Sequence, residues 1–358
     1  MEKDRPPGKP PLVQTSSYEL IARAAQVSRS TVSRVMRNDD RISAPTAARV
    51  REAARQLGYR PNPLLATLME RIRNGRKLSY QGTIGVLTEA EDATHWYGSA
   101  SSWRDIDRGA TRRAAERGYR LEYFSTKPYD HEGRRLSQIL RTRDIHGLYV
   151  APGFSQRRLA MQWEHFSAAT TGYGLVQPSL HRVCYNNYHG VQLACQELRQ
   201  LGYRRIGLYM EQRNDEVTDH NYLAGFLLYL ESVTPADRVR PVRVPRYQAA
   251  AFKAWFEKTR PDAVISSTRQ ILDWAREVGV RSPEEFGFVH LDHHERVPDC
   301  AGINHNSELI GEAVIDLIVA QIHRGETGVP PHPMTTVVEG YWVPGPSAAA
   351  LGTTRATA

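Results

Sequence analysis

The sequence is poor in cysteine and has no long apolar segment. Three of its 358 residues are cysteine, at Cys184, Cys195 and Cys300. An odd and sparse set of this kind argues against a disulfide framework and favours a reducing compartment. The first residues carry no apolar signal region, and no run is long enough to span a bilayer. We therefore expect a cytoplasmic protein without a membrane partner.

Signatures of catalysis and of metal binding are also missing. The sequence has no G-x-S-x-G turn, no H-E-x-x-H and no C-x-x-C, and no glycine-rich phosphate loop follows a predicted strand. The segment Asp292-His293-His294-Glu295 is the best metal candidate, but adjacent loop residues seldom converge on one ion without further ligands. We expect no enzyme, no cofactor and no metal site.

Positive charge is concentrated near the N-terminus. Residues 1–80 hold sixteen Lys and Arg against seven Asp and Glu, whereas the remaining residues hold 31 against 32. A basic block beside a nearly neutral one favours a small nucleic-acid-binding module attached to a separate domain. A solubilising basic tail is the alternative on charge alone.

The basic block contains the pattern of a helix-turn-helix. Residues 18–25 and 28–35 predict two short helices joined by Gln26-Val27, and a third helix is predicted from residue 44 to 57. Ser28 and Ser43 are suited to cap the second and third helices. The second helix has an apolar back, and its front carries hydroxyl and guanidinium groups. In this motif the second helix enters the major groove of DNA.

The remaining sequence alternates strands with helices. Strands are predicted at residues 83–87, 119–124, 147–151, 183–185, 205–209, 263–266 and 286–291, with helices between them and a last helix at 308–323. Such alternation predicts parallel sheets covered by helices. A break near residues 172–178 divides the pattern into two groups, which indicates two lobes.

The chain resembles the LacI/GalR-type bacterial transcription regulators from about residue 17 to residue 346. Residues 26–35 (QVSRSTVSRV) match the family pattern G-V-S-x-x-T-V-S-R-V except at the turn glycine, and residues 42–46 and 57–62 continue the match. Weaker matches follow at residues 144–148, 201–206, 223–226, 261–264 and 310–313. The resemblance implies an α/β fold: an N-terminal all-α helix-turn-helix domain plus a two-lobed type I periplasmic-binding-protein-like effector domain with parallel sheets.

The resemblance also implies which residues bind DNA. Arg29, Ser30 and Arg34 fall on the base-reading positions, and Ser28, Thr31 and Ser33 carry hydroxyls suited to phosphate. In the hinge, Leu68 falls on the leucine that enters the minor groove, Leu65 packs the paired hinge helices, and Asn62 begins the helix. The usual hinge arginine is absent, so a linker helix that never meets DNA remains an alternative.

Effector-binding residues are implied at strand ends, where open α/β sheets bind ligands. They are Glu89, Trp96, Tyr97, Tyr185, Asn186, Tyr222, Asp292 and His305. Flat aromatic rings beside Asp, Asn and His suit a polyhydroxylated ligand. Tyr222 stands where the family has a sugar-gripping arginine. Ordinary packing is the alternative for Trp96, and a structural cap is the alternative for Asp292.

These inferences define an expected organisation. We expect a tail at residues 1–14, a DNA-binding domain at 15–60, a hinge helix and linker at 61–80, an effector domain at 81–346 and a tail at 347–358. Lobe one would comprise residues 81–180 and 306–333, and lobe two residues 181–305 and 334–346. The expected protein is a homodimeric regulator, a repressor by family analogy, which binds pseudo-palindromic double-stranded operator DNA under control of a carbohydrate. An effector-independent regulator and a solute-binding protein without a regulatory role are the alternatives.

Overall fold

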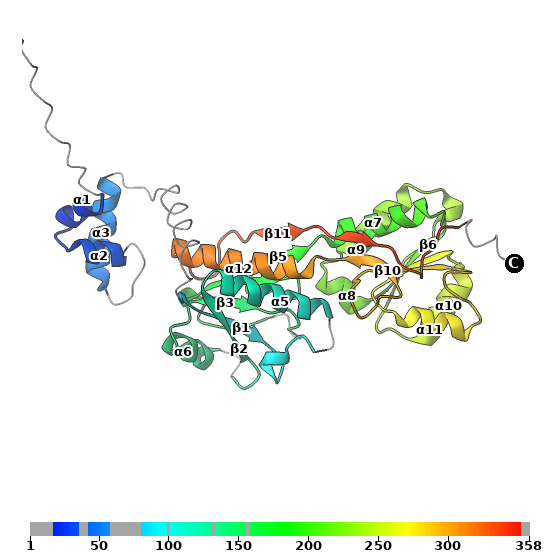
Figure 1. Ribbon diagram of the computed structural model, residues 1–358, viewed down its shortest axis with the longest axis horizontal. Coiled ribbons are helices and arrows are strands. Elements are labelled where there is room, and N and C mark those ends of the chain that lie inside the picture. Colours follow the sequence, from blue (N-terminus) through cyan, green and yellow to red (C-terminus); the bar gives the residue numbers. More distant parts are fainter. Residues whose placement is uncertain are drawn as a thin grey trace, which may run out of the picture. The chain divides into compact units, whose positions relative to one another are not determined.

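The computed structural model describes residues 17–35, 42–57, 80–98, 101–129, 133–154 and 158–351. The chain divides into two units, residues 1–78 and residues 79–358. Each unit has its own hydrophobic core, and Figure 1 shows the elements of each. The expected separation of a small N-terminal module from a larger α/β unit is therefore seen.

Three helices make up the described part of the N-terminal unit: α1 (Ser17–Ala24), α2 (Arg29–Val35) and α3 (Ala44–Gln56). Their apolar faces form one core in which Ile21, Val32 and Val50 are fully buried. This core confirms the three-helix prediction. Ser43 occupies the predicted N-cap position of α3, but its hydroxyl pairs with the Thr46 hydroxyl at 2.9 Å and makes no capping bond to the backbone.

The turn between α1 and α2 carries a backbone strain. Gln26 has a φ of 52°, in the left-handed region that favours glycine. Residues other than glycine lose about 1–2 kcal/mol there. Backbone bonds from Gln26 to Arg23 and from Val27 to Ala22 hold the turn in place. The helix-turn-helix therefore forms although its sequence lacks the usual turn glycine.

The first sheet of the larger unit has the strand order β11-β5-β4-β3-β1-β2, and all its neighbours are parallel. Helices α5 and α12 lie together on one face, and α6 packs on the other through Leu136 and Leu140. The elements of this lobe are β1 (Gly82–Thr88), η1 (Ala93–His95), α5 (Ser101–Glu116), β2 (Tyr119–Ser125), α6 (Arg134–Thr142), β3 (Gly147–Val150), η2 (Trp163–His165), β4 (Ser167–Thr171), β5 (His181–Tyr185), α12 (Ser307–Arg324) and β11 (Thr335–Val338).

The second sheet has the order β12-β10-β9-β8-β6-β7 and is parallel except for the β10–β12 pair. Helices α7 and α9 pack on each other, and the aromatic side chains of α10 contribute to a separate core with α11. The elements are α7 (Asn187–Gln200), β6 (Ile206–Glu211), α8 (Gln212–Val217), α9 (Asn221–Glu231), η3 (Pro235–Asp237), β7 (Val242–Val244), α10 (Ala249–Thr259), β8 (Ala263–Ser266), α11 (Gln270–Glu277), β9 (Gly287–His290), β10 (Ala301–Asn304) and β12 (Tyr341–Val343).

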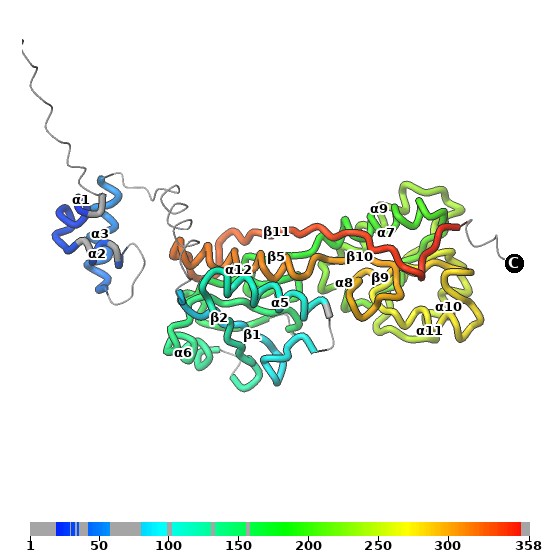
Figure 2. The backbone as a smooth tube through the Cα atoms, in the orientation of Figure 1, coloured from blue at the N-terminus to red at the C-terminus, as the bar shows by residue number. Residues whose placement is uncertain are grey.

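Three segments connect the two lobes, as the chain path in Figure 2 shows: β5 to α7, β10 to α12, and β11 to β12. Asn186 and Asn306 tie them together by donating to Glu339, at 2.8 Å to its carboxylate and 2.7 Å to its carbonyl. Because β5 and β11 belong to the first sheet, the expected start of lobe two at residues 181 and 334 is wrong. The crossings come after Tyr185 and after Val338.

The prediction that a C-terminal tail begins at residue 347 is also wrong for the described residues 347–351. Ser347 is buried, and its hydroxyl donates to the Phe288 carbonyl and accepts from the Ala301 N–H. Leu351 N–H donates to Leu201 at 2.8 Å. The tails at 1–14 and 352–358 lie outside the described residues.

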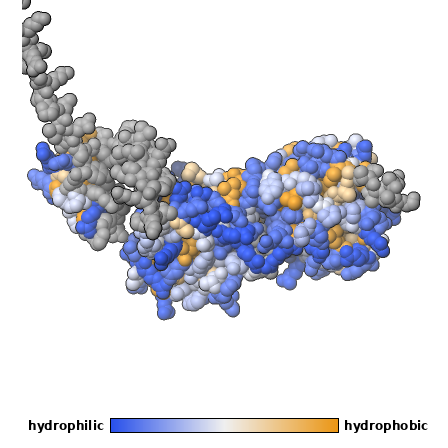
Figure 3. All heavy atoms as spheres, viewed as in Figure 1, coloured by the Kyte–Doolittle hydropathy of each residue, from blue (hydrophilic) through white to orange (hydrophobic). Residues whose placement is uncertain are grey.

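The surface of the larger unit is polar on the face shown in Figure 3, where apolar residues are scattered among hydrophilic ones. Within the described residues, no helix is long and apolar enough to cross a membrane.

Candidate nucleic-acid interface and effector cleft

At the start of α2, the Ser28 hydroxyl bonds to the hydroxyl groups of two residues in the first turn. Ser28 Oγ lies 2.7 Å from Ser30 Oγ and 2.8 Å from Thr31 Oγ1, and it accepts the Thr31 backbone N–H at 3.1 Å. This last bond confirms the predicted cap. Ser28 and Ser30 are exposed, whereas Val32 and Val35 on the opposite side are buried. The helix therefore has a fixed apolar back and a polar front suited to phosphate and base contacts.

Several expected DNA-binding positions cannot be placed on this face. Asn62, Leu65 and Leu68 lie outside the described residues, as do the side chains of Arg29 and Ser33. Arg34 is half-buried near the end of α2.

In the larger unit, the structure brings four of the expected effector residues into one cluster. Tyr185 ends β5, Tyr222 begins α9, Asp292 follows β9, and His305 follows β10. The rings of Tyr185 and His305 stack with centroids 3.8 Å apart, and the Tyr222 hydroxyl lies 3.2 Å from His305 Nε2. His305 Nδ1 lies 3.4 Å from Asp292 Oδ1.

A contact between the lobes completes this cluster. Ser102, in the first turn of α5, donates to Asp292 Oδ2 at 2.8 Å. Asp292 Oδ1 and the Tyr185 hydroxyl are buried without a hydrogen-bond partner within the described part of the chain. Buried polar atoms are nearly always hydrogen-bonded, so these two atoms have an unused capacity to accept or donate a hydrogen bond.

Burial governs the ionisation of the cluster. Burial alone raises the pKa of Asp292, but the imidazoles of His305 and His290 and the Ser102 hydroxyl outweigh it, so this pKa lies below its usual value. Burial lowers the pKa of His305, and it lowers the pKa of His290 to about 4. At neutral pH the site therefore holds a carboxylate among uncharged imidazoles.

A second group of expected residues lines a cavity of about 380 Å³ at the ends of β1 and β3. Trp96 and Trp103 stack with centroids 6.0 Å apart, and Glu89 and Lys127 add charge to the wall. Trp96 Nε1 donates to Asp107 at 3.1 Å. Burial raises the pKa of Asp107, and the hydrogen bonds from the Tyr123 hydroxyl and Trp96 oppose this shift.

The other two expected residues have structural partners. Tyr97 packs its edge against Trp96, with the Arg104 guanidinium over its ring at 5.5 Å. Asn186 caps α7 by accepting the His189 N–H at 3.1 Å and donates to Glu339. Asn186 thus belongs to the connection between the lobes.

Sequence reasoning missed several polar residues that lie next to these groups. Ser102 and Asp107 are two of them, and both lie in α5, where the surrounding sequence is that of an ordinary helix. A third set follows β6, β7 and β8: Asn214 Nδ2 donates to Ser267 Oγ at 2.9 Å, and the Tyr247 hydroxyl lies 2.8 Å from the same oxygen. Asn214 lies in α8, whereas Tyr247 and Ser267 lie in the loops after β7 and β8, so no local pattern could have united them.

Among the residues that the structure describes, no group of three or more His, Cys, Asp or Glu side chains is arranged to hold a metal ion.

Comparison with known proteins agrees with this architecture. The model of bacterial regulatory proteins of the lacI family matches residues 20–62, and that of the periplasmic binding protein-like domain matches residues 195–347. The chain is 24% identical to the HTH-type transcriptional regulator CelR of Thermobifida fusca over 345 residues, which cover 88% of this chain and 94% of CelR. It is 31% identical to the ribose operon repressor of Escherichia coli K12 over 130 residues, covering 36% of this chain and 35% of the repressor.

Solved structures show the same fold. A CelR–cellobiose complex aligns with a TM-score of 0.56 at 21% identity, covering 93% of this chain and all of that one (100%). The lac repressor dimer bound to operator and the anti-inducer ONPF aligns with a TM-score of 0.55 at 20% identity, covering 94% and 99%.

A helix-turn-helix unit followed by a two-lobed binding unit defines a class of bacterial regulators. Within that class, this chain carries the DNA-binding domain of the lacI family at residues 20–62 and a periplasmic binding protein-like domain at residues 195–347, and its named relatives are transcriptional regulators.

Proposed function

We propose that this chain is a sequence-specific DNA-binding transcriptional regulator, a repressor, whose operator affinity is controlled by a carbohydrate bound between its lobes. The observation that carries the proposal is the presence, in one chain, of a hydroxyl-bearing helix α2 and a side-chain cluster between the lobes with an unsatisfied carboxylate oxygen, Asp292 Oδ1. A sugar hydroxyl is a donor suited to that oxygen.

The cavity beside Trp96 and Trp103 supports the same ligand class. Indole faces pack against the CH faces of a sugar ring, while Glu89 and Lys127 can bond its hydroxyl groups. Tyr222 is an uncharged side chain at the position where the family has a cationic arginine. A neutral sugar therefore fits better here than a sugar acid. Two relatives are named for cellobiose or ribose, and these sugars are the first to test.

The proposed assembly is a homodimer. Two recognition helices need symmetric half-sites, so a pseudo-palindromic operator implies a two-fold symmetric protein. In this proposal Arg29, Ser30 and Arg34 read bases, the remaining α2 hydroxyls contact phosphate, and Leu68 enters the minor groove. The proposed regulator acts in the cytoplasm and performs no catalysis.

A regulator without a small effector is the second candidate. The contacts of Ser102 with Asp292 and of Tyr222 with His305 already join side chains within the cleft. If these bonds alone hold the lobes together, no sugar is needed to close them.

Thermal unfolding with a ligand panel separates the two candidates. The panel contains cellobiose, ribose, sugar acids and sugar phosphates, and each is tested on the wild-type protein and on Asp292→Ala. A ligand that binds only the native state raises the midpoint by mass action. A shift that is lost in Asp292→Ala supports the carbohydrate-controlled regulator, whereas no shift with any compound favours the second candidate.

DNA binding is tested with the same protein. Affinity for a selected duplex and for random DNA is measured as a function of salt. Phosphate contacts make the affinity for both DNAs fall as the salt concentration rises. Only contacts with base edges make the affinity for the selected duplex higher than that for random DNA. Coincident curves contradict a sequence-specific regulator.

A further inference from the structure

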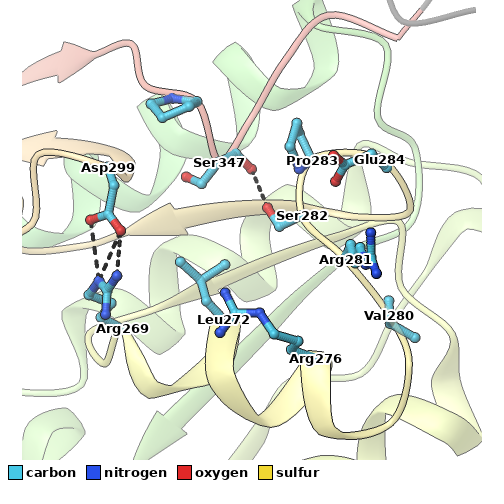
Figure 4. Close-up of a pocket in the computed structure, with 11 residues that line it drawn as sticks. Arg269, Leu272, Arg276, Val280, Arg281, Ser282, Pro283, Glu284, Asp299 and Ser347 are labelled. Atoms are coloured by element: carbon cyan, nitrogen blue, oxygen red, sulfur yellow. Dashed lines mark hydrogen bonds and ion pairs between the residues drawn. The ribbon is translucent and has the colours of Figure 1, made fainter.

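The second lobe has a cavity of about 540 Å³ that shares no residue with the cleft. Figure 4 shows it between α11, the loop that follows α11, and the segment around Ser347. Three arginines, Arg269, Arg276 and Arg281, point toward it from different parts of this wall. We propose that this cavity binds a small organic oxyanion of charge −2 or more, such as a phosphate monoester or a polycarboxylate.

The three arginines differ in how far they are neutralised. Arg269 is paired with Asp299, with its Nε 3.2 Å from both carboxylate oxygens. Arg276 pairs with Asp273 at 3.1 Å, but both side chains are exposed, by 69% and 51%, and such pairs contribute little. No described side chain bonds to the guanidinium of Arg281; only its backbone N–H donates, to the Glu285 carboxylate at 2.8 Å.

The wall has two acidic residues, Asp299 and Glu284, and Asp299 is paired with Arg269. Arg276 and Arg281 are therefore available for a ligand against the single remaining carboxylate, that of Glu284. Guanidinium groups bind carboxylate and phosphate through paired N–H donors, which makes them the usual residues for these anions. Leu272, Val280 and Pro283 form an apolar part of the wall. The volume lies within the range of small-molecule sites. The charges and the apolar wall together favour an organic anion over a bare inorganic ion.

The position of the cavity makes it a separate site. Ser347 lies on its wall and bonds to Phe288 and Ala301, at the beginnings of β9 and β10. The cleft residues Asp292 and His305 follow the ends of the same two strands. An anion in this cavity and a sugar in the cleft would thus contact opposite ends of β9 and β10, and both could bind at once.

The test is thermal unfolding and calorimetric titration of the full chain with citrate, glucose 6-phosphate and inorganic phosphate. The double variant Arg276→Gln/Arg281→Gln removes both available cations. Arg240→Gln is the matched control, because it removes an exposed arginine from the same lobe outside the cavity. Glu284→Gln removes the acidic wall charge, and Asp292→Ala removes the cleft carboxylate.

We expect citrate or glucose 6-phosphate to bind wild-type protein and to bind the double variant at least about tenfold more weakly, because two charge-assisted contacts are lost. Arg240→Gln and Asp292→Ala should leave this affinity unchanged, and Glu284→Gln should increase it. The proposal is overturned if no organic anion binds, if inorganic phosphate binds equally well, or if the double variant binds like the control. Loss of binding in Asp292→Ala alone would place the anion in the cleft and also overturn it.

Discussion

Removing the Ser102 hydroxyl should loosen the contact between the two lobes. Ser102 and Asp292 are 190 residues apart in the sequence, and their 2.8 Å hydrogen bond joins α5 of the first lobe to the loop after β9 in the second. In Ser102→Ala this bond is lost, and Asp292 Oδ2 keeps no hydroxyl donor from α5. The lobes should then spend more time apart.

The magnitude follows from the charge and exposure of Asp292. Hydrogen bonds to charged groups contribute about 1.5–3 kcal/mol. The Asp292 side chain is 30% exposed, so water replaces part of the lost bond. We expect a net cost of about 1–2 kcal/mol, which is about a five- to thirtyfold shift toward the open form.

Energy transfer between two labels measures this shift. Cysteines introduced at the exposed positions Arg141 and Arg240 place one label on each lobe. The native cysteines are buried, and burial raises the pKa of the Cys184 thiol to about 11 and of the Cys300 thiol to about 12, so they react slowly. Ser102→Ala should widen the distance distribution between the labels.

Ser232→Ala is the matched control, because its hydroxyl bonds to Tyr229 within one lobe. The double variant Ser102→Ala/Asp292→Asn should show less than the sum of the single effects, since both changes remove the same bond. An unchanged distribution in Ser102→Ala, or additive effects in the double variant, would refute a coupling between the lobes through this pair.

Three further predictions concern the two units separately. Gln26→Gly should stabilise the N-terminal unit by about 0.5–1 kcal/mol, because glycine relieves the left-handed strain but gains entropy in the unfolded chain. The helix content followed during thermal unfolding measures this change. A lower unfolding midpoint in the variant would contradict the prediction. His290 should contribute a fall of about 2 kcal/mol in the unfolding free energy between pH 7 and pH 5, because unfolded His290 gains a proton at its ordinary pKa while the folded residue, with a pKa of about 4, does not. In denaturant titrations His290→Gln should flatten this slope, and an equal slope would exclude His290 as its source. Arg29→Ala should weaken operator binding by about 1–3 kcal/mol and reduce discrimination at one base pair. Binding to operator variants with single-base changes measures this effect. An equal loss of affinity on every operator variant would indicate a phosphate contact instead.

Local patterns predicted the helix-turn-helix well. The apolar spacing of Ile21, Val32 and Val50 places three helices around one core, and the Ser28 cap depends only on residues three positions apart. The apolar spacing within each helix and the Ser28 cap are local, so the sequence alone indicates both. Ser43 takes its predicted N-cap position, but its hydroxyl bonds to the Thr46 hydroxyl and not to the backbone.

Lobe membership was harder to predict because it depends on strand order. Thr335–Val338 and His181–Tyr185 are short strands that pair with each other across about 150 residues of intervening chain. Periodicity identifies a strand but not its neighbour. The structure therefore moved both strands into the first lobe.

The cleft was predicted in outline but not in its bonds. The resemblance supplied Tyr222, Asp292 and His305, which the structure brings together. Ser102 and Asp107 were not predicted, because their partners come from distant or different elements and their own sequence context is that of an ordinary helix. Such contacts exist only once the lobes are folded.

The most direct test measures the affinity of the full chain for operator DNA while the sugar that raises its thermal midpoint is titrated. This single experiment tests both DNA recognition and the effect of the ligand. The account predicts tight binding to the selected duplex, an affinity change of about tenfold or more at saturating sugar, and no such change in Asp292→Ala. The same affinity with and without a sugar that binds the cleft, or equal affinity for random DNA, would contradict it.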